Sequence, residues 1–379
     1  MNFDQKNLGR LGMTEEQVEL MDVAENFCRD TSDIETVRKL IDGETGFDPS
    51  LWEKISALGW LGIAIPENYG GVGLSLAEVV PVAEQMGRRM MALPFIPTTL
   101  AAQALLSAGT EAQKQTYLPK IAEGMIASVA LSEINGSFDL AQINASAALG
   151  PDGYVLTGQK ILVQNLDQAA CLIISAKLGG EICLFAVDTD LIPPANMRRE
   201  IIIDETKRSY ALKLDGVTIP ENARMEPGET RAALKRIDLA ASLLGSAEQV
   251  GASQNCIDYT VDYLKTRKQF GKLIGSYQAL KHTAVDVYVG YEKAKSLLYA
   301  AAFSFEDQGQ GEAATRMAAV GAGRALAFAA DRAIQFHGGF GFTYDCDAQL
   351  YRRRAIFNDS LYGNIRWHKR QLSGLLFRS

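Results

Sequence analysis

Histidine and cysteine are scarce in this sequence, and neither residue type forms a cluster. The three histidines, His282, His337 and His368, lie far apart along the chain, so a multi-histidine metal site is not expected. The five cysteines are odd in number and include no CxxC pair. This pattern argues against a disulfide framework or a zinc site and is typical of a reducing compartment. We therefore expect a cytoplasmic protein without a metal site.

Long apolar runs and excess positive charge are also missing. No run approaches the ~18 apolar residues that suggest a membrane span. The first residues, MNFDQKNLGRLGM, lack the apolar core of a signal peptide. The formal net charge is −7, which argues against a nucleic-acid backbone as the main partner. We expect neither a membrane nor a nucleic acid as partner.

The overall composition is typical of a folded protein with several parts. Hydrophobic residues make up 47% of the sequence and charged residues 22%, which are ordinary values. A chain of 379 residues is too long for one small core. Helical patterns flank a β-rich middle, so we expect a mainly α protein with a central β domain. The expected domains are residues 1–125, 126–227 and 228–379.

Helical signals fill the first of these regions. Thr14 followed by Gln17 forms a capping-box pattern at a helix start. Apolar residues from Trp52 to Leu61 recur at helical spacing, and the stretch 98–124 is also helical in pattern. We expect helices over all three stretches.

The middle and last regions differ in their sequence patterns. GYVLTGQKILV (153–163), ACLIISAK (170–177) and EICLFAV (181–187) are apolar, β-branched runs of strand length. LGG at 178–180 predicts a hairpin between the last two runs. Long helical patterns return from about residue 228, with further helices expected from near 276 and 312. Such helices pack well as an antiparallel bundle.

Two segments of the last region contain residues suited to a phosphorylated ligand. In TRKQFGKLIGSYQALK, Arg267 offers a forked donor for phosphate, Phe270 a stacking surface and Gln278 an amide. In QFHGGFGF, Gln335 adds a second amide, and the glycines permit close backbone approach. Ordinary helix ends with glycine caps would give the same patterns. The residues alone leave the two interpretations open.

ALGWLGIAIPENYGGVGLS, the β-rich middle, TRKQFGKLIGSYQALKH and AIQFHGGFGF together resemble acyl-CoA dehydrogenases, in the same order and spacing. The resemblance covers nearly the whole chain. It implies an N-terminal helical domain, a middle β-barrel or sandwich and a C-terminal four-helix bundle. It also implies FAD as cofactor and an acyl-CoA substrate, oxidised between Cα and Cβ in fatty acid or steroid side-chain degradation. A homo- or hetero-tetramer and electron-transfer flavoprotein as electron acceptor are implied too.

In the family, an FAD site is shared between two subunits, and the resemblance assigns residues to both halves. The half that reaches the neighbour's nucleotide is complete here and consists of Arg267, Phe270, Gln278, Gln335, Gly338 and Gly339. The half that holds the flavin ring resembles the family motifs TEPxAGSD and WITN in SEINGSFD (132–139) and LVQN (162–165). Ser132 can replace the threonine hydroxyl, but Leu162 replaces the tryptophan and Gln164 the second threonine.

The catalytic base of the family is a glutamate, and neither of its expected positions holds one here. SLYGN places Tyr362 at one position, and counting back from the arginine segment places Ala241 at the other. Glu248, two helical turns after Ala241, is either a displaced base or a hydrogen-bonded carboxylate. Asp359 is expected to be a solvated or capping acid. The catalytic residue stays unassigned.

Three hypotheses follow. The chain is the base-lacking subunit of a heteromeric acyl-CoA dehydrogenase, or it is a self-sufficient dehydrogenase with a displaced base such as Glu248. The third hypothesis is a flavin-dependent monooxygenase or a non-catalytic paralogue of the same fold.

Overall fold

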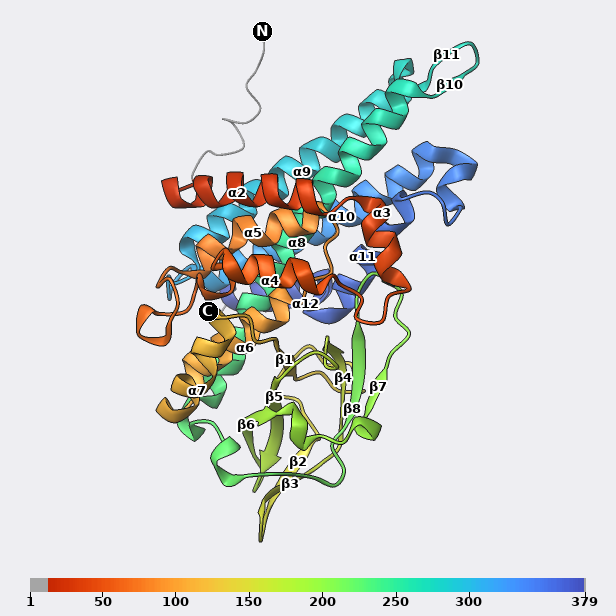
Figure 1. Cartoon of the computed structure of the whole chain (residues 1–379). Helices are drawn as coiled ribbons and strands as arrows, with labels where there is room; N and C mark the ends of the chain where they lie inside the picture. The colour runs from red at the N-terminus through yellow and green to blue at the C-terminus, as the bar shows by residue number, and fades with distance from the viewer. Residues whose placement is uncertain (1–12, 378–379) are drawn as a thin grey trace. The chain divides into compact units, whose positions relative to one another are not determined.

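The computed structural model describes residues 13–377, which form two compact units (Figure 1). The first unit combines the segments Met1–Val37, Leu76–Met91 and Ser242–Ser379. The second unit combines Arg38–Ser75 and Ala92–Ala241. Each unit therefore draws residues from the N-terminal helical region.

The first unit begins with α2 (Glu15–Thr31). The predicted capping box is confirmed: the N–H of Gln17 donates to Oγ1 of Thr14, and the N–H of Thr14 donates to Oε1 of Gln17, both at 3.2 Å. These bonds satisfy free amide donors and fix where the helix starts. α2 packs against α5 (Leu76–Arg88) of the same unit.

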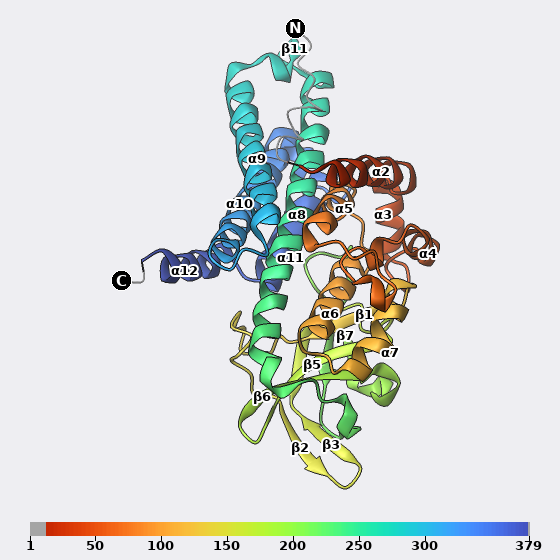
Figure 2. The same cartoon turned by 90° about the vertical axis from the view of Figure 1, so that its left-hand side faces the viewer.

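Long helices form the rest of the first unit. They are α8 (Thr230–Thr266, which begins in the second unit), α9 (Gln278–Ser304), α10 (Gly311–His337), α11 (Ala348–Leu361) and α12 (Ile365–Leu376). The predicted starts near 228, 276 and 312 are each confirmed to within two residues. α10 packs along α9, α11 and α12, and Figure 2 shows α9 and α10 side by side.

Two glycines allow α5 and α8 to cross closely. A Cβ atom at Gly87 would overlap the carbonyl oxygen of Glu248, and one at Gly251 would overlap that of Glu84. Each glycine thus faces the backbone of the other helix. Only a residue without a side chain permits this approach.

The helices of the second unit are α4 (Pro49–Ala57), α6 (Phe95–Ala108) and α7 (Glu111–Ala122), and α3 (Ile34–Ile41) ends in it. The helix predicted as far as Leu61 stops earlier, at Ala57. Gly59 has a φ of 73°, which breaks the α-helical path, and a 3-10 turn follows at Trp60–Gly62. The stretch 98–124 is helical, but a second capping box at Thr110 starts α7 separately.

Nine strands of the second unit form two sheets. They are β1 (Ala127–Ala130), β2 (Ser146–Gly150), β3 (Gly153–Thr157), β4 (Gln159–Gln164), β5 (Cys171–Leu178), β6 (Glu181–Asp188), β7 (Met197–Arg199), β8 (Ser209–Lys213) and β9 (Val217–Ile219). The larger sheet has the order β1-β5-β2-β3-β9, with β6 also paired to β5, and the smaller has the order β4-β8-β7.

The predicted hairpin between β5 and β6 is confirmed. Leu178 pairs with Glu181 across a two-residue turn, and both turn residues, Gly179 and Gly180, have positive φ, as a type I′ turn requires. The run 153–163 is not one strand but two, because the chain turns at Gly158 and β3 and β4 join different sheets.

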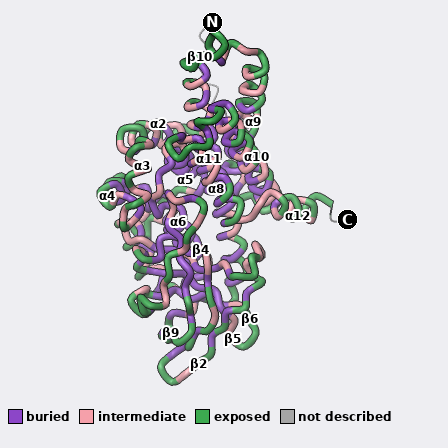
Figure 3. Tube along the Cα trace, turned by 90° about the vertical axis from the view of Figure 1, so that its right-hand side faces the viewer, coloured by how far each residue is buried: buried purple, intermediate pink, exposed green. Residues whose placement is uncertain are grey.

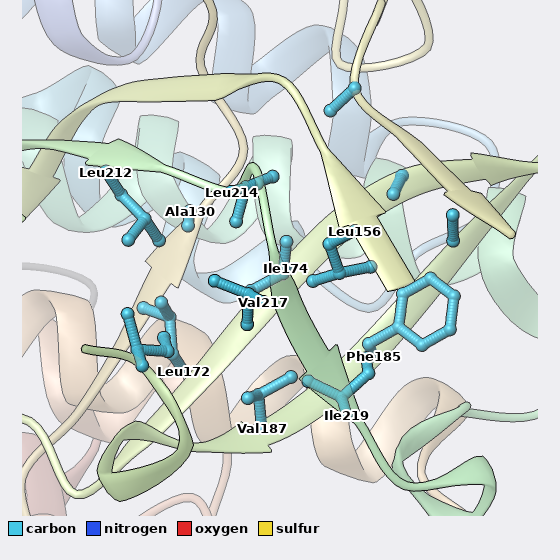
Figure 4. Packing of buried hydrophobic residues seen from close by; sticks show 14 of the residues in the cluster. Ala130, Leu156, Leu172, Ile174, Phe185, Val187, Leu212, Leu214, Val217 and Ile219 are labelled. Carbon is cyan, nitrogen blue, oxygen red and sulfur yellow. The ribbon is translucent and has the colours of Figure 1, made fainter. Parts of the chain in front are cut away.

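The core of the second unit lies between these strands. Figure 4 shows Leu156, Ile174, Phe185 and Val217 pointing toward one another from different strands. Burial of each such side chain contributes roughly 1.5–3 kcal/mol. Figure 3 shows buried positions along the strands and exposed ones at the β2–β3 turn.

Helical N- and C-terminal regions therefore flank a middle β region, which confirms the expected fold class. The boundaries of the three expected domains stay a prediction.

Candidate functional site

A two-residue hairpin turn in the first unit presents an aromatic ring to solvent. β10 (Lys268–Gln269) pairs with β11 (Lys272–Leu273) around Phe270 and Gly271. These two residues have φ values of 51° and 80°, as in a type I′ turn. Positive φ is unfavourable for a bulky residue, and Phe270 is 91% exposed. The hairpin thus keeps a strained, solvent-facing ring where asparagine or glycine would be more stable.

The backbone on both sides of this hairpin is fixed by hydrogen bonds. The N–H of Arg267 donates to the carbonyl of Tyr263, and the carbonyl of Arg267 accepts from the N–H of Ile274, each at 2.9 Å. The side chain of Arg267 is exposed. Gln278, the first residue of α9, is exposed as well.

The end of α10 is an exposed glycine turn. Gln335 is exposed, and its carbonyl accepts from the N–H of Gly338, which has a φ of 62°. A Cβ atom at Gly338 or Gly339 would meet no other atom within 4 Å. The backbone of this turn is therefore open to a ligand.

An apolar cluster brings the hairpin and the glycine turn together within the first unit. Leu264 at the end of α8, Ile274 after the hairpin and Phe336 in the last turn of α10 are buried against one another. Residues predicted from two separate motifs thus lie on elements that share a packed core.

The chemistry of these residues fits the nucleotide part of FAD. A guanidinium matches a pyrophosphate, an exposed ring provides a stacking surface for a base, and side-chain amides both donate and accept. The open backbone at Gly338 and Gly339 leaves room for close approach.

The candidate ring-side residues lie in the second unit. The carbonyl of Ser132 accepts from the N–H of Ile161 at 3.0 Å. The next residue, Glu133, is buried and accepts from Nζ of Lys160 at 2.8 Å and from the N–H groups of Asn144 and Ala145. Burial alone would raise the pKa of Glu133, but Lys160 and the two N–H groups lower it on balance. The carboxylate is therefore held ionised.

The Glu133–Lys160 pair was missed by the sequence reasoning. Nζ of Lys160 also donates to Oγ of Ser175 at 3.0 Å, and the lysine side chain is fully buried. One signal was available in the sequence, because Lys160 stands inside an apolar run of strand length. A lysine buried there requires a partner, since buried charges are almost always paired.

Residues 162–165 follow a strained path. Leu162 and Asn165 have φ values of 56° and 50°, and the pairing of β4 with β8 shifts register between Lys160 and Val163. The N–H of Leu162 donates to Oε2 of Glu200 at 3.0 Å, which supports the bulge. Such strain in non-glycine residues is concentrated at functional sites.

The first expected base position, Tyr362, directly follows the last residue of α11. Its ring lies beside α8, because a Cβ atom at Gly245 would be 3.6 Å from Cδ2 of Tyr362. The second position, Ala241, is buried and lies one helical turn before Gly245 in α8. Neither side chain can act as a carboxylate base.

Glu248 is buried in the first unit, with both carboxylate oxygens engaged. Nη1 of Arg354 lies 3.0 Å from Oε1, and Nδ2 of Asn358 lies 3.1 Å from Oε2. The geometry therefore favours the hydrogen-bonded, structural interpretation of Glu248. Asp359, by contrast, is exposed and accepts from the N–H of Ile365 at 3.3 Å, near the start of α12.

A buried histidine holds the turn after Tyr362. Nε2 of His368 lies 3.0 Å from the carbonyl oxygen of Gly363, and Nδ1 lies 3.4 Å from Nη1 of Arg316. A carbonyl only accepts, so Nε2 carries the proton and Nδ1 accepts from arginine. Burial, and then the charge of Arg316, lower the pKa of His368 to about 4.

In the part of the chain that the structure describes, every helix is too short or too polar to cross a membrane. Within residues 13–377 there is also no group of three or more His, Cys, Asp or Glu side chains that could hold a metal ion.

Comparison with known proteins identifies the family. Residues 14–125 match the acyl-CoA dehydrogenase N-terminal domain, and residues 231–372 match the acyl-CoA dehydrogenase C-terminal domain. The chain is 30% identical over 368 residues to acyl-CoA dehydrogenase IpdE2 of Mycolicibacterium smegmatis, covering 96% of this chain and 100% of that relative.

Two solved structures are also similar. The ChsE4-ChsE5 complex from Mycobacterium tuberculosis has a chain with a TM-score of 0.85 and 25% identity, covering 97% of this chain and 98% of that one. A Tcur3481-Tcur3483 steroid ACAD variant gives a TM-score of 0.84 and 28% identity, covering 96% and 98%. The chain therefore belongs to the acyl-CoA dehydrogenase family, whose members are FAD-dependent oxidoreductases acting on CH–CH bonds.

Proposed function

We propose that this chain is the subunit without a catalytic glutamate in a heteromeric, FAD-dependent acyl-CoA dehydrogenase. In this assembly Arg267, Phe270 and Gln278, together with the glycine turn of α10, contact the nucleotide of an FAD whose ring is held by the partner subunit. The observation that carries the proposal is the exposed ring of Phe270 in a strained turn. Strain of this kind persists where it has a functional use.

The reaction is the α,β-desaturation of an acyl-CoA thioester. A glutamate of the partner would take the α-proton, and FAD, when bound, would supply the hydride acceptor for Cβ. In this chain, the Arg267 guanidinium neutralises and orients the pyrophosphate, and the ring of Phe270 stacks on the nucleotide and excludes water. None of these residues has to transfer a proton, so the missing base does not impair them.

Two observations support a hetero-assembly over a self-sufficient enzyme. Tyr362 and Ala241 stand where the family resemblance expects the base, and both oxygens of Glu248 already accept hydrogen bonds. One similar solved structure is a complex of two named proteins, ChsE4 and ChsE5, and another is called a steroid ACAD. We propose by similarity a tetramer of unlike pairs, a bulky, steroid-type acyl-CoA substrate and electron-transfer flavoprotein as acceptor. All five cysteines are buried and free, consistent with a cytoplasmic location.

The test is to produce the chain alone and together with a second acyl-CoA dehydrogenase that has the glutamate. Molar mass and bound FAD are measured for both samples. We expect little FAD on the chain alone, and an unlike pair that binds FAD and is reduced by an acyl-CoA. A chain that binds FAD alone and reduces it with an acyl-CoA would contradict the proposal. Oxygen insertion into a substrate would favour the monooxygenase hypothesis.

Substitutions in this chain separate its contribution from that of the partner. Arg267→Gln is expected to weaken FAD binding by the assembly about tenfold or more, because a charge-assisted hydrogen bond to phosphate is lost. Lys265→Gln removes an equally exposed charge two residues earlier and serves as the matched control. Equal FAD affinity of both variants would remove Arg267 from the site.

A further inference from the structure

His337 lies between two tyrosine rings of α8. Its ring stacks on that of Tyr259, with centroids 4.8 Å apart and an interplanar angle of 12°. It also stacks on Tyr263, with centroids 4.1 Å apart and an angle of 25°. The two tyrosines are four residues apart and so share one face of the helix. The last residue of α10 is thereby held against the last turns of α8.

A hydrogen bond fixes how this imidazole is oriented. Nδ1 lies 2.7 Å from the carbonyl oxygen of Ala333, one turn earlier in α10. Nδ1 therefore carries the proton and donates. The side chain is 3% exposed, and burial lowers the pKa of His337, although the Ala333 carbonyl and Asp347 act in the opposite sense. The ring is thus neutral and well placed for stacking.

The stack connects directly to both segments of the nucleotide site. On one side, the carbonyl of Tyr263 accepts from the N–H of Arg267, so the residue whose ring contacts His337 also holds the backbone of Arg267. On the other side, Gly338 and Gly339 follow His337 without an intervening residue, and Gln335 precedes it by two. The position of one ring therefore affects where the arginine and the glycine turn lie relative to each other.

We propose that His337 is a positioning residue of the nucleotide site, and that its stacking between Tyr259 and Tyr263 sets the spacing between Arg267 and the glycine turn. It does not need to touch the ligand itself. This inference rests on the proposed function, because the nucleotide is the ligand whose site is being positioned.

The test compares His337→Ala, which removes the stack, with His337→Phe, which keeps a flat ring but not the hydrogen bond. Tyr263→Leu removes one of the two ring contacts from the α8 side and serves if His337→Ala does not fold. All variants are prepared in the complete assembly with the partner subunit. Tyr299→Phe, which loses a buried hydroxyl bonded to Glu84 elsewhere in the first unit, is the control for general destabilisation.

Two readouts are measured: amide hydrogen exchange over residues 267–276 and 338–342, and the rate at which FAD leaves the assembly. Loss of both ring contacts should raise both rates about tenfold in His337→Ala, and loss of one contact should raise them by a smaller factor in Tyr263→Leu. His337→Phe should raise them by no more than about twofold. Tyr299→Phe should lower the unfolding temperature without changing either rate.

Hydrogen exchange is informative even without flavin. If the wild-type assembly contains no FAD, the proposed function fails, while faster exchange in both segments of His337→Ala still supports the positioning role. If wild type holds FAD and His337→Ala matches it in both readouts, the positioning role is wrong. It is also wrong if His337→Phe behaves like His337→Ala, because the ring contact would then not be the cause.

Discussion

Arg354 of α11 reaches Glu248 of α8 as a buried ion pair, with 3.0 Å between Nη1 and Oε1 and no solvent exposure of the arginine side chain. Asn358, one turn after Arg354, donates to the other carboxylate oxygen. The pair joins two helices of the first unit. It also gives Arg354, the last of the three consecutive arginines at 352–354, and Glu248, the one candidate replacement base, a shared structural role.

Glu248→Gln tests this role. Removal of one partner of a buried pair leaves an uncompensated charge on Arg354, so we expect the free energy of unfolding to fall by about 3–5 kcal/mol. Urea unfolding measures the change. The double variant Glu248→Leu with Arg354→Met should recover much of the loss, since an apolar pair carries no buried charge. If Glu248→Gln instead kept its stability and lost turnover in the assembly, Glu248 would be the base.

Phe270 offers a case where stability and binding should change in opposite directions. Phe270→Asn places a residue that tolerates positive φ in the hairpin turn. We expect the free energy of unfolding to rise by up to about 1 kcal/mol, while FAD binding by the assembly weakens through loss of the stacking ring. Thermal unfolding and FAD titration measure the two effects. Weaker FAD binding together with lower stability would show that the turn had collapsed.

Because α5 and α8 cross closely, we expect one methyl group added at the crossing to lower the free energy of unfolding strongly. Gly251→Ala puts a Cβ atom into the backbone of Glu84, so the helices must separate, and we expect a loss of about 1–3 kcal/mol or more in the free energy of unfolding. Gly290→Ala is the matched control. Gly290 lies inside α9, where a Cβ atom meets nothing within 4 Å, so alanine should stabilise the helix by up to about 1 kcal/mol. Equal effects of the two substitutions would rule out the close crossing.

The lowered pKa of His368 predicts a loss of stability in mild acid. Its pKa is about 4 in the folded chain and about 6.5 when unfolded. Between these values the unfolded chain binds more protons, so stability present above about pH 6.5 is lost as the pH falls toward 4, by about 3 kcal/mol at most. Unfolding free energies at several pH values, compared with His368→Gln, isolate this contribution. Parallel pH profiles for the two proteins would argue against it.

The residues proposed to contact the nucleotide could be named from the sequence because the family resemblance assigns them within two short segments. Phe270-Gly271 fits a two-residue turn, and Gln335 stands next to the glycines in one short segment. Turn chemistry and helix ends depend on a few neighbouring backbone bonds. For the same reason the capping box at Thr14 and the β5–β6 hairpin were predicted correctly. The prediction of a helix as far as Leu61 was wrong, because it did not allow for the left-handed conformation of Gly59.

The roles of the buried polar groups were decided only by the tertiary structure. Glu248 pairs with Arg354, which lies 106 positions later in the sequence, and Glu133 pairs with Lys160, which lies 27 positions later. Tyr259 and Tyr263 carry no signal in the sequence that would link them to His337. The sequence determined which residue types were present and the local turns that hold them. Which buried charge meets which partner depends on long-range packing of helices and strands, and no local pattern encodes it.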